Sequence, residues 1–435
     1  MNWFSLSLQL NRFPIRKAKL ALERIKRIPE EDYEAYVRHT REDIVKYHLE
    51  NTPFYRDFFR DGSFDPWGKV PVMTKKDLQR PLEERLSQKF SSKNVYIGKT
   101  SGSSGTPFIF AKDRFCHALS WAEFNDRYGW YGLDLDRSVQ ARFYGIPLDG
   151  FGYFRERLKD RFGFRYRFPV FDLSERKMEE FLQDFEKKNF DYINGYTSSI
   201  VLFARFLKNK GLVLKELCPN LKLCIVTSEM LFQEDRELIE EQFDLPVINE
   251  YGASELGLIA FENEEGEWIL NSETMYVEVV DEEGFPVPDG NEGRIVVTSL
   301  YNKAHPFIRY DIGDLGRLSR EGTSKKRILN SLIGRTNDVA VLPSGKVVPG
   351  LTFYYVTKSV ISDTGTVREF IVKQTGQGEF RIIYAADNEF NPDQKEKIEL
   401  AMARYLEPGL DVTFEFRKTL RRNSRGKLKQ FESMV

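Results

Sequence analysis

The stretch from Leu221 to Asn249 constrains the fold of this chain more than any other part of the sequence. Leu221–Thr227 is a short, mainly apolar run that predicts a buried strand, Phe232–Phe243 predicts a helix, and Pro246–Asn249 predicts a second strand. A strand, a helix and a strand at this spacing are typical of two parallel strands joined by a crossover. The chain is therefore expected to contain a parallel α/β sheet.

The flanking regions differ in character. The first hundred residues favour helices, as in Glu31–Glu50, and residues 171–213 favour helices interrupted at Tyr192–Gly195. Residues 268–318 favour strands, and the sequence beyond Asp338 favours a compact mixture of strands and helix. The segments expected there are strands Met275–Val280, Gly293–Ser299, Phe370–Lys373, Phe380–Tyr384 and Val412–Phe416, and helix Pro392–Leu406.

Bulk composition excludes several classes of protein. With 65 Lys plus Arg against 66 Asp plus Glu, the net charge of −1 gives no general attraction to nucleic acid. Three cysteines without metal-site spacing predict buried thiols in a cytoplasmic protein, and four scattered histidines argue against a histidine metal site. The sequence contains no run of 18 apolar residues, so no membrane span is expected.

The N-terminal segment Met1–Arg27 holds seven basic residues and one acid. Its apolar part is interrupted by polar residues and no small-residue cleavage site follows, so a signal peptide fits poorly. An amphipathic helix that docks on a membrane or a partner is one interpretation. The favoured interpretation is a helix that packs on the body of the protein itself.

The run Thr100–Thr106 carries five hydroxyls and two glycines in seven positions. Glycine lets a backbone approach an anion closely, and hydroxyls and N–H groups supply hydrogen-bond donors. The run therefore fits a loop that wraps a polyphosphate. A solvated Ser/Gly linker fits the same composition.

Four later segments carry side chains suited to a nucleotide: Asn249–Glu255, Arg309–Asp314, Gly334–Asp338 and Ser424–Lys427. In the first, Tyr251 is suited to stack on a purine and Glu255 to hold Mg²⁺. In the second, the Asp314 carboxylate follows a glycine turn and is suited to accept from two sugar hydroxyls. Taken singly, each segment also fits an ordinary turn or, near the C-terminus, a solvated basic tail.

Taken together and in this order, the five segments resemble the adenylate-forming superfamily of acyl-CoA synthetases, nonribosomal adenylation domains and luciferases. The resemblance runs from about residue 95 to 430. The short length, the helical first hundred residues and the Tyr-Gly-x-Ser-Glu form are most similar to the phenylacetate–CoA ligase-like branch, which includes capsular-polysaccharide-associated members. It implies an α/β fold with layered α/β subdomains and a β-rich subdomain in a large N-terminal domain, residues 1–336, and a small mobile α+β domain, residues 337–435, that acts as a lid.

The resemblance also implies roles for single residues on the nucleotide. The loop residues Thr100, Ser101, Gly102, Ser103, Ser104, Gly105 and Thr106 would grip the β- and γ-phosphates of ATP. The residues expected along adenine and at the α-phosphate are Thr227, Ser228, Glu229, Asn249, Tyr251, Gly252 and Ser254. Asp314 and Arg335 would contact the ribose.

Three further roles concern catalysis and the acid. Glu255 would hold Mg²⁺, Lys427 would bridge the substrate carboxylate and the α-phosphate, and Asn337 would be the hinge of the C-terminal domain. Tyr144, Tyr196 and Ala253 are the candidates for the carboxylate pocket, within an aromatic and basic stretch from 142 to 168 that also fits core aromatics under a solvated face.

Two positions depart from the family pattern. Many members carry a lysine after the proline of the phosphate loop, where this chain has Phe108. The phenylacetate–CoA ligase-like branch often lacks this lysine too, so we interpret Phe108 as a character of the branch. The hinge is usually aspartate or lysine, and here it is Asn337, which weakens the case for a second half-reaction driven by domain rotation.

The expected activity is ATP-dependent formation of an acyl-adenylate from a carboxylic acid, with release of pyrophosphate, followed by transfer to coenzyme A. Three alternatives stay open: transfer to an amine or amino-sugar in polysaccharide biosynthesis, adenylylation without transfer, and a nucleotide-binding scaffold without turnover. The identity of the acid and the oligomeric state do not follow from the sequence.

Overall fold

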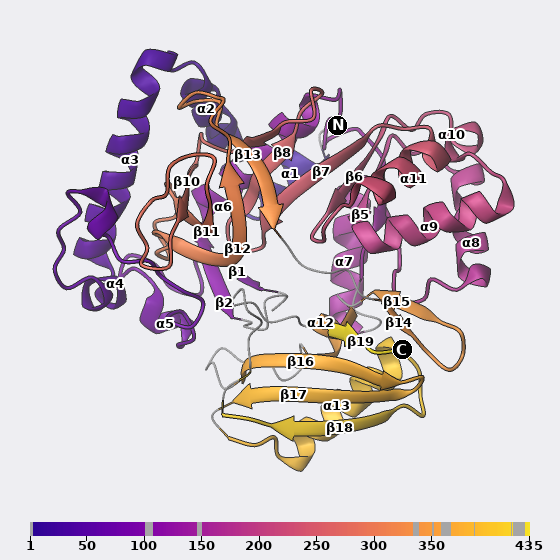
Figure 1. Ribbon diagram of the computed structural model, residues 1–435. Helices are drawn as coiled ribbons and strands as arrows, with labels where there is room; N and C mark the ends of the chain where they lie inside the picture. The colour runs from indigo at the N-terminus through magenta and orange to yellow at the C-terminus, as the bar shows by residue number, and fades with distance from the viewer. Residues whose placement is uncertain are drawn as a thin grey trace.

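The computed structural model describes residues 3–100, 108–145, 150–333, 339–349, 352–357, 367–386, 388–418, 420 and 431–435. Within these residues a mixed sheet of eleven strands forms the large N-terminal part, and a separate sheet of four strands lies in the C-terminal part (Figure 1). The expected α/β fold, with one large and one small sheet, is confirmed at this level.

Five neighbouring strands of the large sheet are parallel. In sheet order they are β4 (Arg165–Phe168), β3 (Gln140–Phe143), β5 (Tyr192–Tyr196), β6 (Leu223–Thr227) and β7 (Val247–Ala253). Helix α11 (Gln233–Phe243) connects β6 to β7, so the predicted strand, helix and strand are confirmed. The break predicted at Tyr192–Gly195 is strand β5, between helices α8 (Glu175–Lys187) and α9 (Thr197–Lys210).

The rest of the large sheet is antiparallel, and β7 is the strand at which the sheet changes. Beyond β7 the order is β8 (Gly257–Glu262), β9 (Trp268–Leu270), β13 (Ile328–Ile333), β12 (Tyr310–Leu318), β11 (Glu292–Ser299) and β10 (Met275–Val280). The β-rich region expected from 268 to 318 is therefore confirmed, and it extends the sheet that the parallel strands begin.

Helices cover both faces of the parallel strands. Successive side chains of a strand point to opposite faces. On β6, Leu223 and Ile225 pack in a cluster with α1 (Trp3–Leu10), α2 (Ile15–Lys26) and α6 (Arg114–Gly129), while Cys224 and Val226 pack with α8, α9, α10 (Leu214–Leu217) and α11. The N-terminal helices pack on the body of the protein, as the favoured interpretation of Met1–Arg27 predicted.

The remaining N-terminal elements lie against the antiparallel half or near the sheet edge. They are α3 (Glu30–Asn51), α4 (Pro53–Phe58), the short helix η1 (Trp67–Lys69), α5 (Leu82–Arg85), α7 (Gly150–Phe162) and the hairpin β1 (Val95–Lys99) and β2 (Ile109–Asp113). Ile44 and Val45 of α3 and Phe54 and Tyr55 of α4 belong to the core of the antiparallel half.

The C-terminal part has a core of its own, whose buried members lie between Ala340 and Phe431. Its elements are β14 (Val339–Val341), β15 (Val347–Pro349), α12 (Thr352–Thr357), β16 (Val367–Gly376), β17 (Glu379–Ala386), α13 (Pro392–Tyr405), β18 (Asp411–Phe416) and β19 (Phe431–Ser433), with sheet order β18-β17-β16-β19. The boundary predicted between residues 336 and 337 lies outside the described residues and stays a prediction.

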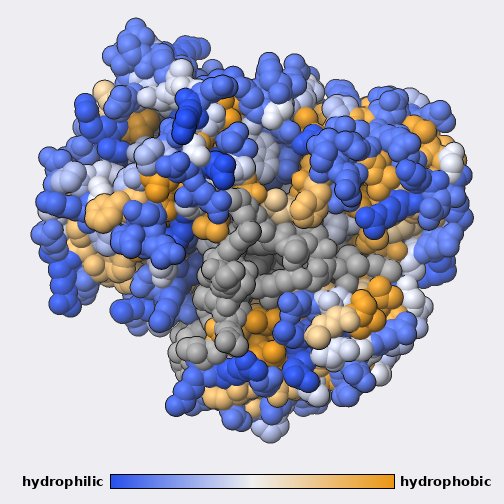
Figure 2. All heavy atoms as spheres, in the orientation of Figure 1, coloured by the Kyte–Doolittle hydropathy of each residue, from blue (hydrophilic) through white to orange (hydrophobic). Residues whose placement is uncertain are grey.

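Three smaller observations concern the thiols, the helices and the surface. Cys116, Cys218 and Cys224 are buried and unbridged, as predicted. No helix in the described ranges is both long and apolar enough to cross a membrane. Hydrophilic side chains cover most of the face seen in Figure 2, and apolar side chains appear there in separate patches.

Candidate active site

A cavity of about 420 Å³ opens where the parallel strands end. Tyr144 follows β3, Tyr196 ends β5, Thr227 ends β6 and Ala253 ends β7, and all four residues line the cavity. Parallel strands bring their carboxyl ends to one edge of a sheet, and ligands of open α/β sheets bind outside that edge. The position of the cavity therefore follows from the strand directions.

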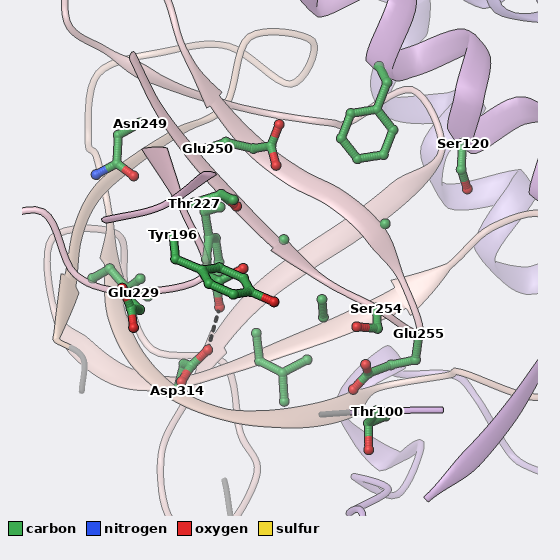
Figure 3. Close-up of a pocket in the computed structure, with 18 of the residues that line it drawn as sticks. Thr100, Ser120, Tyr196, Thr227, Glu229, Asn249, Glu250, Ser254, Glu255 and Asp314 are labelled. Carbon is green, nitrogen blue, oxygen red and sulfur yellow. Dashed lines mark hydrogen bonds between the residues drawn. The ribbon is translucent and has the colours of Figure 1, made fainter. Parts of the chain in front are cut away.

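The cavity gathers most of the site residues expected from the sequence (Figure 3). Those that line it are Thr100, Tyr144, Tyr196, Thr227, Ser228, Glu229, Asn249, Tyr251, Gly252, Ala253, Ser254, Glu255 and Asp314. The other candidates, Ser101, Gly102, Ser103, Ser104, Gly105, Thr106, Arg335, Asn337 and Lys427, lie outside the described residues. Segments more than two hundred positions apart in the chain thus meet at one site.

Thr100 and Phe108, on either side of residues 101–107, are hydrogen-bonded to each other. The Thr100 N–H donates to the Phe108 carbonyl at 3.0 Å, and the Phe108 N–H donates to Thr100 Oγ1 at 2.9 Å. Both residues are buried, and they continue the ladder of the β1–β2 hairpin. The Phe108 ring packs against Phe110, Phe307 and Tyr310, so it is part of the core.

Tyr251 and Asp314 form a bonded pair on one side of the cavity. The Tyr251 hydroxyl donates to Asp314 Oδ2 at 3.0 Å, and both side chains are buried. The Tyr251 ring lies nearly parallel to Trp268, with 6.2 Å between ring centroids. The two segments singled out in the sequence, around Tyr251 and Asp314, are therefore linked directly in the fold.

Glu255 is buried beside a tyrosine and a lysine. Its Oε1 accepts from the Tyr310 hydroxyl at 2.8 Å. Lys112 of β2 donates from Nζ to the Leu256 carbonyl at 2.9 Å and lies close enough to interact electrostatically with Glu255. Burial lowers the pKa of the Lys112 ammonium, and nearby Cys116, Glu123 and Glu255 oppose that shift.

The residues present suit Mg²⁺ held together with a nucleotide. In the described part of the chain, no cluster of three or more His, Cys, Asp or Glu side chains could hold a metal ion. Mg²⁺ is commonly bound through one or two carboxylates, substrate phosphates and water, and the single carboxylate of Glu255 fits that pattern.

Glu229 and Gly252 shape the walls of the cavity. The Ser198 N–H, at the start of α9, donates to Glu229 Oε2 at 2.7 Å, which ties the end of β6 to the first turn of that helix. Burial raises the pKa of the Glu229 carboxyl. A Cβ at Gly252 would lie 2.6 Å from the Gly257 carbonyl oxygen, so this approach of β7 to β8 requires glycine.

Several lining residues were missed at the sequence level. They are Lys75, Tyr96, Lys99, Lys112, His117, Ser120, Trp121, Phe124, Met230, Glu250, Gly257, Trp268, Ile312 and Leu332. His117, Ser120, Trp121 and Phe124 lie on α6 at spacings that a helix places on one face. That spacing was the available signal, but it is equally typical of core packing.

The aromatic stretch from 142 to 168 divides between the two interpretations. Phe143 and Phe168 are buried in the core beside α8 and α9. Tyr144 lines the cavity, with its ring centroid 4.6 Å from that of Tyr196. Phe154 of α7 is exposed.

Comparisons with known proteins agree with this architecture. The chain is 25% identical to protein CapK of Staphylococcus aureus over 351 residues, which cover 74% of this chain and 72% of CapK. It is 25% identical to the phenylacetate-coenzyme A ligase of Pseudomonas putida over 333 residues, 70% of this chain and 71% of the ligase. No protein-family model matches the chain.

The fold is also similar to a solved ligase. The structure of 2-hydroxyisobutyryl-CoA ligase with 2-HIB-AMP and CoA in the thioesterification state aligns with a TM-score of 0.58 and 16% identity, covering 93% of this chain and 90% of that one. The motif order, the fold and these relatives agree: the chain is a member of the adenylate-forming superfamily, with phenylacetate-coenzyme A ligases and protein CapK as distant homologues at 25% identity.

Proposed function

We propose that this protein uses ATP to convert a carboxylic acid to an acyl-adenylate and then transfers the acyl group to coenzyme A. The observation that carries the proposal is the single cavity that Thr100, Tyr251, Glu255 and Asp314 line together. These side chains are suited to the phosphates, the adenine, the Mg²⁺ and the ribose of ATP, respectively. The names of the relatives, phenylacetate-coenzyme A ligase and 2-hydroxyisobutyryl-CoA ligase, support the same reaction class.

In the first step a carboxylate oxygen attacks the α-phosphorus of ATP. The bond from that phosphorus to the bridging oxygen breaks, and pyrophosphate leaves with the electron pair. The free carboxylate is a poor electrophile, and the AMP group gives it a good leaving group. The work of the protein is to align the reactants in line and to balance the charge of the leaving pyrophosphate.

On the nucleotide, Tyr251 would stack on adenine and Asp314 would accept from the ribose hydroxyls. The Tyr251–Asp314 hydrogen bond fixes the ring and the carboxylate relative to each other before ATP arrives. Fixing both groups in advance lowers the ordering cost of binding. Arg335 would add a ribose contact.

On the phosphates, the run Thr100–Thr106 would supply backbone amides and hydroxyls. Phe108 packs in the core, so the charge of the lysine that many relatives carry there must come from elsewhere. Lys75 and Lys99 line the same cavity, and Lys99 directly precedes Thr100. These two lysines are suited to balance the β- and γ-phosphates.

At the reacting centre, Glu255 would hold Mg²⁺, which supplies charge neutralisation on the phosphates when it is bound. The Tyr310 hydroxyl, which donates to Glu255, orients the carboxylate, and the charge of Lys112 lies nearby. Lys427, from the C-terminal domain, would bridge the substrate carboxylate and the α-phosphate.

In the second step the thiolate of coenzyme A attacks the acyl carbon, the bond to AMP breaks and AMP leaves. We propose that the C-terminal domain, beginning near Asn337, turns between the two steps. An uncharged asparagine at this position still permits the backbone rotation that a hinge needs.

The test is pyrophosphate release from ATP by the full chain, across a panel of aromatic, fatty, amino and sugar acids, with and without coenzyme A. The expected result is acid-dependent release, and an acyl-CoA product when the thiol is present. ATP binding without release for any acid would favour a scaffold. Release without transfer to thiols or amines would favour adenylylation alone.

A further inference from the structure

Glu250 places a buried carboxylate on the wall of the cavity, away from Asp314 (Figure 3). Its side chain is 9% exposed, and its Oε2 accepts from the Tyr128 hydroxyl of α6 at 2.7 Å. The Thr227 hydroxyl also lies near this carboxylate. Burial raises the pKa of the Glu250 carboxyl, and these hydroxyls and the more distant Arg142 oppose that shift.

Among the residues that the structure describes, this carboxylate has no ion pair. Within the described residues, no Lys, Arg or His nitrogen lies within 4.0 Å of a Glu250 oxygen. The Arg142 guanidinium instead stacks on the Tyr144 ring at 4.2 Å and donates to Gln140 at 3.3 Å. Enclosing an unpaired carboxylate with an apolar ligand carries a desolvation cost that a cationic partner offsets.

The walls beside Glu250 are aromatic. Tyr144 and Tyr196 lie with ring centroids 4.6 Å apart, and Trp121 and Phe124 of α6 with centroids 5.6 Å apart. All four line the cavity. Aromatic faces attract cations, most strongly where water is excluded.

Two basic side chains line the same wall, Lys112 and His117, and neither forms an ion pair with Glu250. Lys112 Nζ is already bonded to the Leu256 carbonyl and lies 3.4 Å from Ser120 Oγ. His117 Nε2 accepts from Trp121 Nε1 at 3.2 Å, and burial lowers the pKa of His117 to about 3, so the ring is neutral at pH 7. Glu250 is therefore a carboxylate on this wall without an ion pair among the described residues, and Lys112 and Arg142 contribute positive charge nearby.

We propose that the acid activated by this protein carries a cationic amino group, which pairs with Glu250 inside the aromatic walls of Tyr144, Tyr196, Trp121 and Phe124. This inference rests on the proposed function, because it assigns the substrate class of the same cavity. Glu250 is then a specificity-determining residue, which contacts the distal group of the acid and takes no part in the transfer of the adenylyl group from ATP to the acid.

The experiment compares matched acids that differ by an ammonium in place of a methyl group. Suitable pairs are γ-aminobutyrate and pentanoate, ε-aminocaproate and heptanoate, and para-aminomethylphenylacetate and para-ethylphenylacetate. Pyrophosphate release is measured for wild type, Glu250→Gln, Glu250→Asp and Tyr128→Phe. Tyr128→Phe is the matched control, because it removes a hydrogen bond to Glu250 and leaves the carboxylate in the cavity. Thermal melting identifies any variant that fails to fold.

Wild type is expected to prefer the amino member of at least one pair by about tenfold or more in kcat/KM, as a charge-assisted contact provides. Glu250→Gln should abolish that preference through KM for the acid, with KM for ATP unchanged. Glu250→Asp should retain part of the preference, and Tyr128→Phe most of it.

Two results would overturn the inference in different ways. Turnover of the neutral acids at an amino-to-neutral ratio that Glu250→Gln does not change would reject the amino substrate and leave the proposed function standing. Absence of pyrophosphate release from wild type with every acid would reject the proposed function itself, and the inference with it.

Discussion

The two sides of the cavity are built in different ways. The Asp314 side, formed by Asp314 of β12, Tyr251 of β7 and the end of β6, uses residues of motifs that lie in strands or at a strand end, and the Tyr251 and Asp314 side chains are bonded to each other. The Glu250 side, formed by Glu250, Tyr144, Tyr196 and α6, uses side chains from separate elements that meet only in the fold. The Asp314 side is therefore built from recognisable sequence motifs, whereas the Glu250 side is built from single side chains that the fold brings together.

The largest expected effect belongs to neither side but to Lys427, the proposed bridge between the substrate carboxylate and the α-phosphate. Lys427→Ala should lower acid-dependent pyrophosphate exchange by about 10²–10³, or roughly 2.7–4 kcal/mol of barrier, because a charge at the transition state is lost. ATP binding, measured by calorimetry, should change little. Lys429→Ala, in the same basic tail, is the control. Exchange at the wild-type rate in Lys427→Ala would remove this lysine from the mechanism.

The Asp314 side should respond to substitution through ATP alone. Asp314→Ala is expected to raise KM for ATP by about 10- to 100-fold, because hydrogen bonds to a charged group contribute about 1.5–3 kcal/mol. The preference among acids should stay as in wild type. Asp314 is proposed to bind the ribose and is also bonded to Tyr251. Tyr251→Phe tests the second contact alone, since it keeps the ring and removes only the Tyr251–Asp314 bond. A changed acid preference in Asp314→Ala would show that the two sides are not separate.

The Glu250 side should respond through the acid alone. Phe124→Ala removes a ring that lines the cavity and is expected to raise KM for the acid by roughly 1–2 kcal/mol of lost apolar contact, about 5- to 30-fold. KM for ATP should stay within about twofold. Steady-state kinetics with each substrate varied in turn measure both values. A parallel rise in KM for ATP would contradict the comparison.

The smallest expected effect concerns the support behind the Glu250 side. Glu123 of α6 is buried, and burial raises its carboxyl pKa from 4.5 to about 8, against the opposing Thr274 hydrogen bond and the charges of Arg127 and Lys112. The folded state therefore binds this proton more tightly than the unfolded state, so stability falls as pH rises from 4.5 to about 8. Glu123→Gln has no carboxyl to titrate and should therefore remove this pH-dependent loss of stability.

Urea denaturation at pH 5 and pH 8 measures this effect. Glu123→Gln should gain stability relative to wild type between the two pH values, by roughly 1 kcal/mol or more. Glu186→Gln, on the exposed face of α8, is the control and should show no such gain. An equal difference from wild type at both pH values would contradict the shifted pKa.

The Asp314 side and the Glu250 side also differ in how much of each could be predicted from the sequence. The Asp314 side was predictable because its residues lie in short motifs beside glycines, as in Asn249–Glu255. The strand, helix and strand around β6 and β7 were predictable from apolar runs and spacing. For α1 and α2 the sequence left two interpretations, docking on a membrane or partner and packing on the protein itself, and it favoured the second.

The Glu250 side was only partly predictable. Tyr144, Tyr196 and Ala253 were expected there, but the residues of α6 were not, because a helix face that lines a cavity has the same spacing as one that packs in a core. Glu250 was missed for a related reason. It lies in the segment Asn249–Glu255, in which other residues, among them Tyr251 and Glu255, were given roles on the nucleotide. Successive side chains of a strand point to opposite faces, so Glu250 can line a different part of the cavity from Tyr251.

Strand β7 also sets a length for the substrate. Glu250 lies near its middle and Ala253 at its end, three residues further, which on a strand is a separation of roughly 10 Å. The ladder with β8 shifts register between Tyr251 and Gly252, and Gly252 lies against the Gly257 backbone, so this part of the strand has little freedom to move. If one end of an acid meets Glu250 and its carboxylate meets the ATP beside Ser254, the strand acts as a ruler. Acids would then be selected by the number of atoms between their two charged ends.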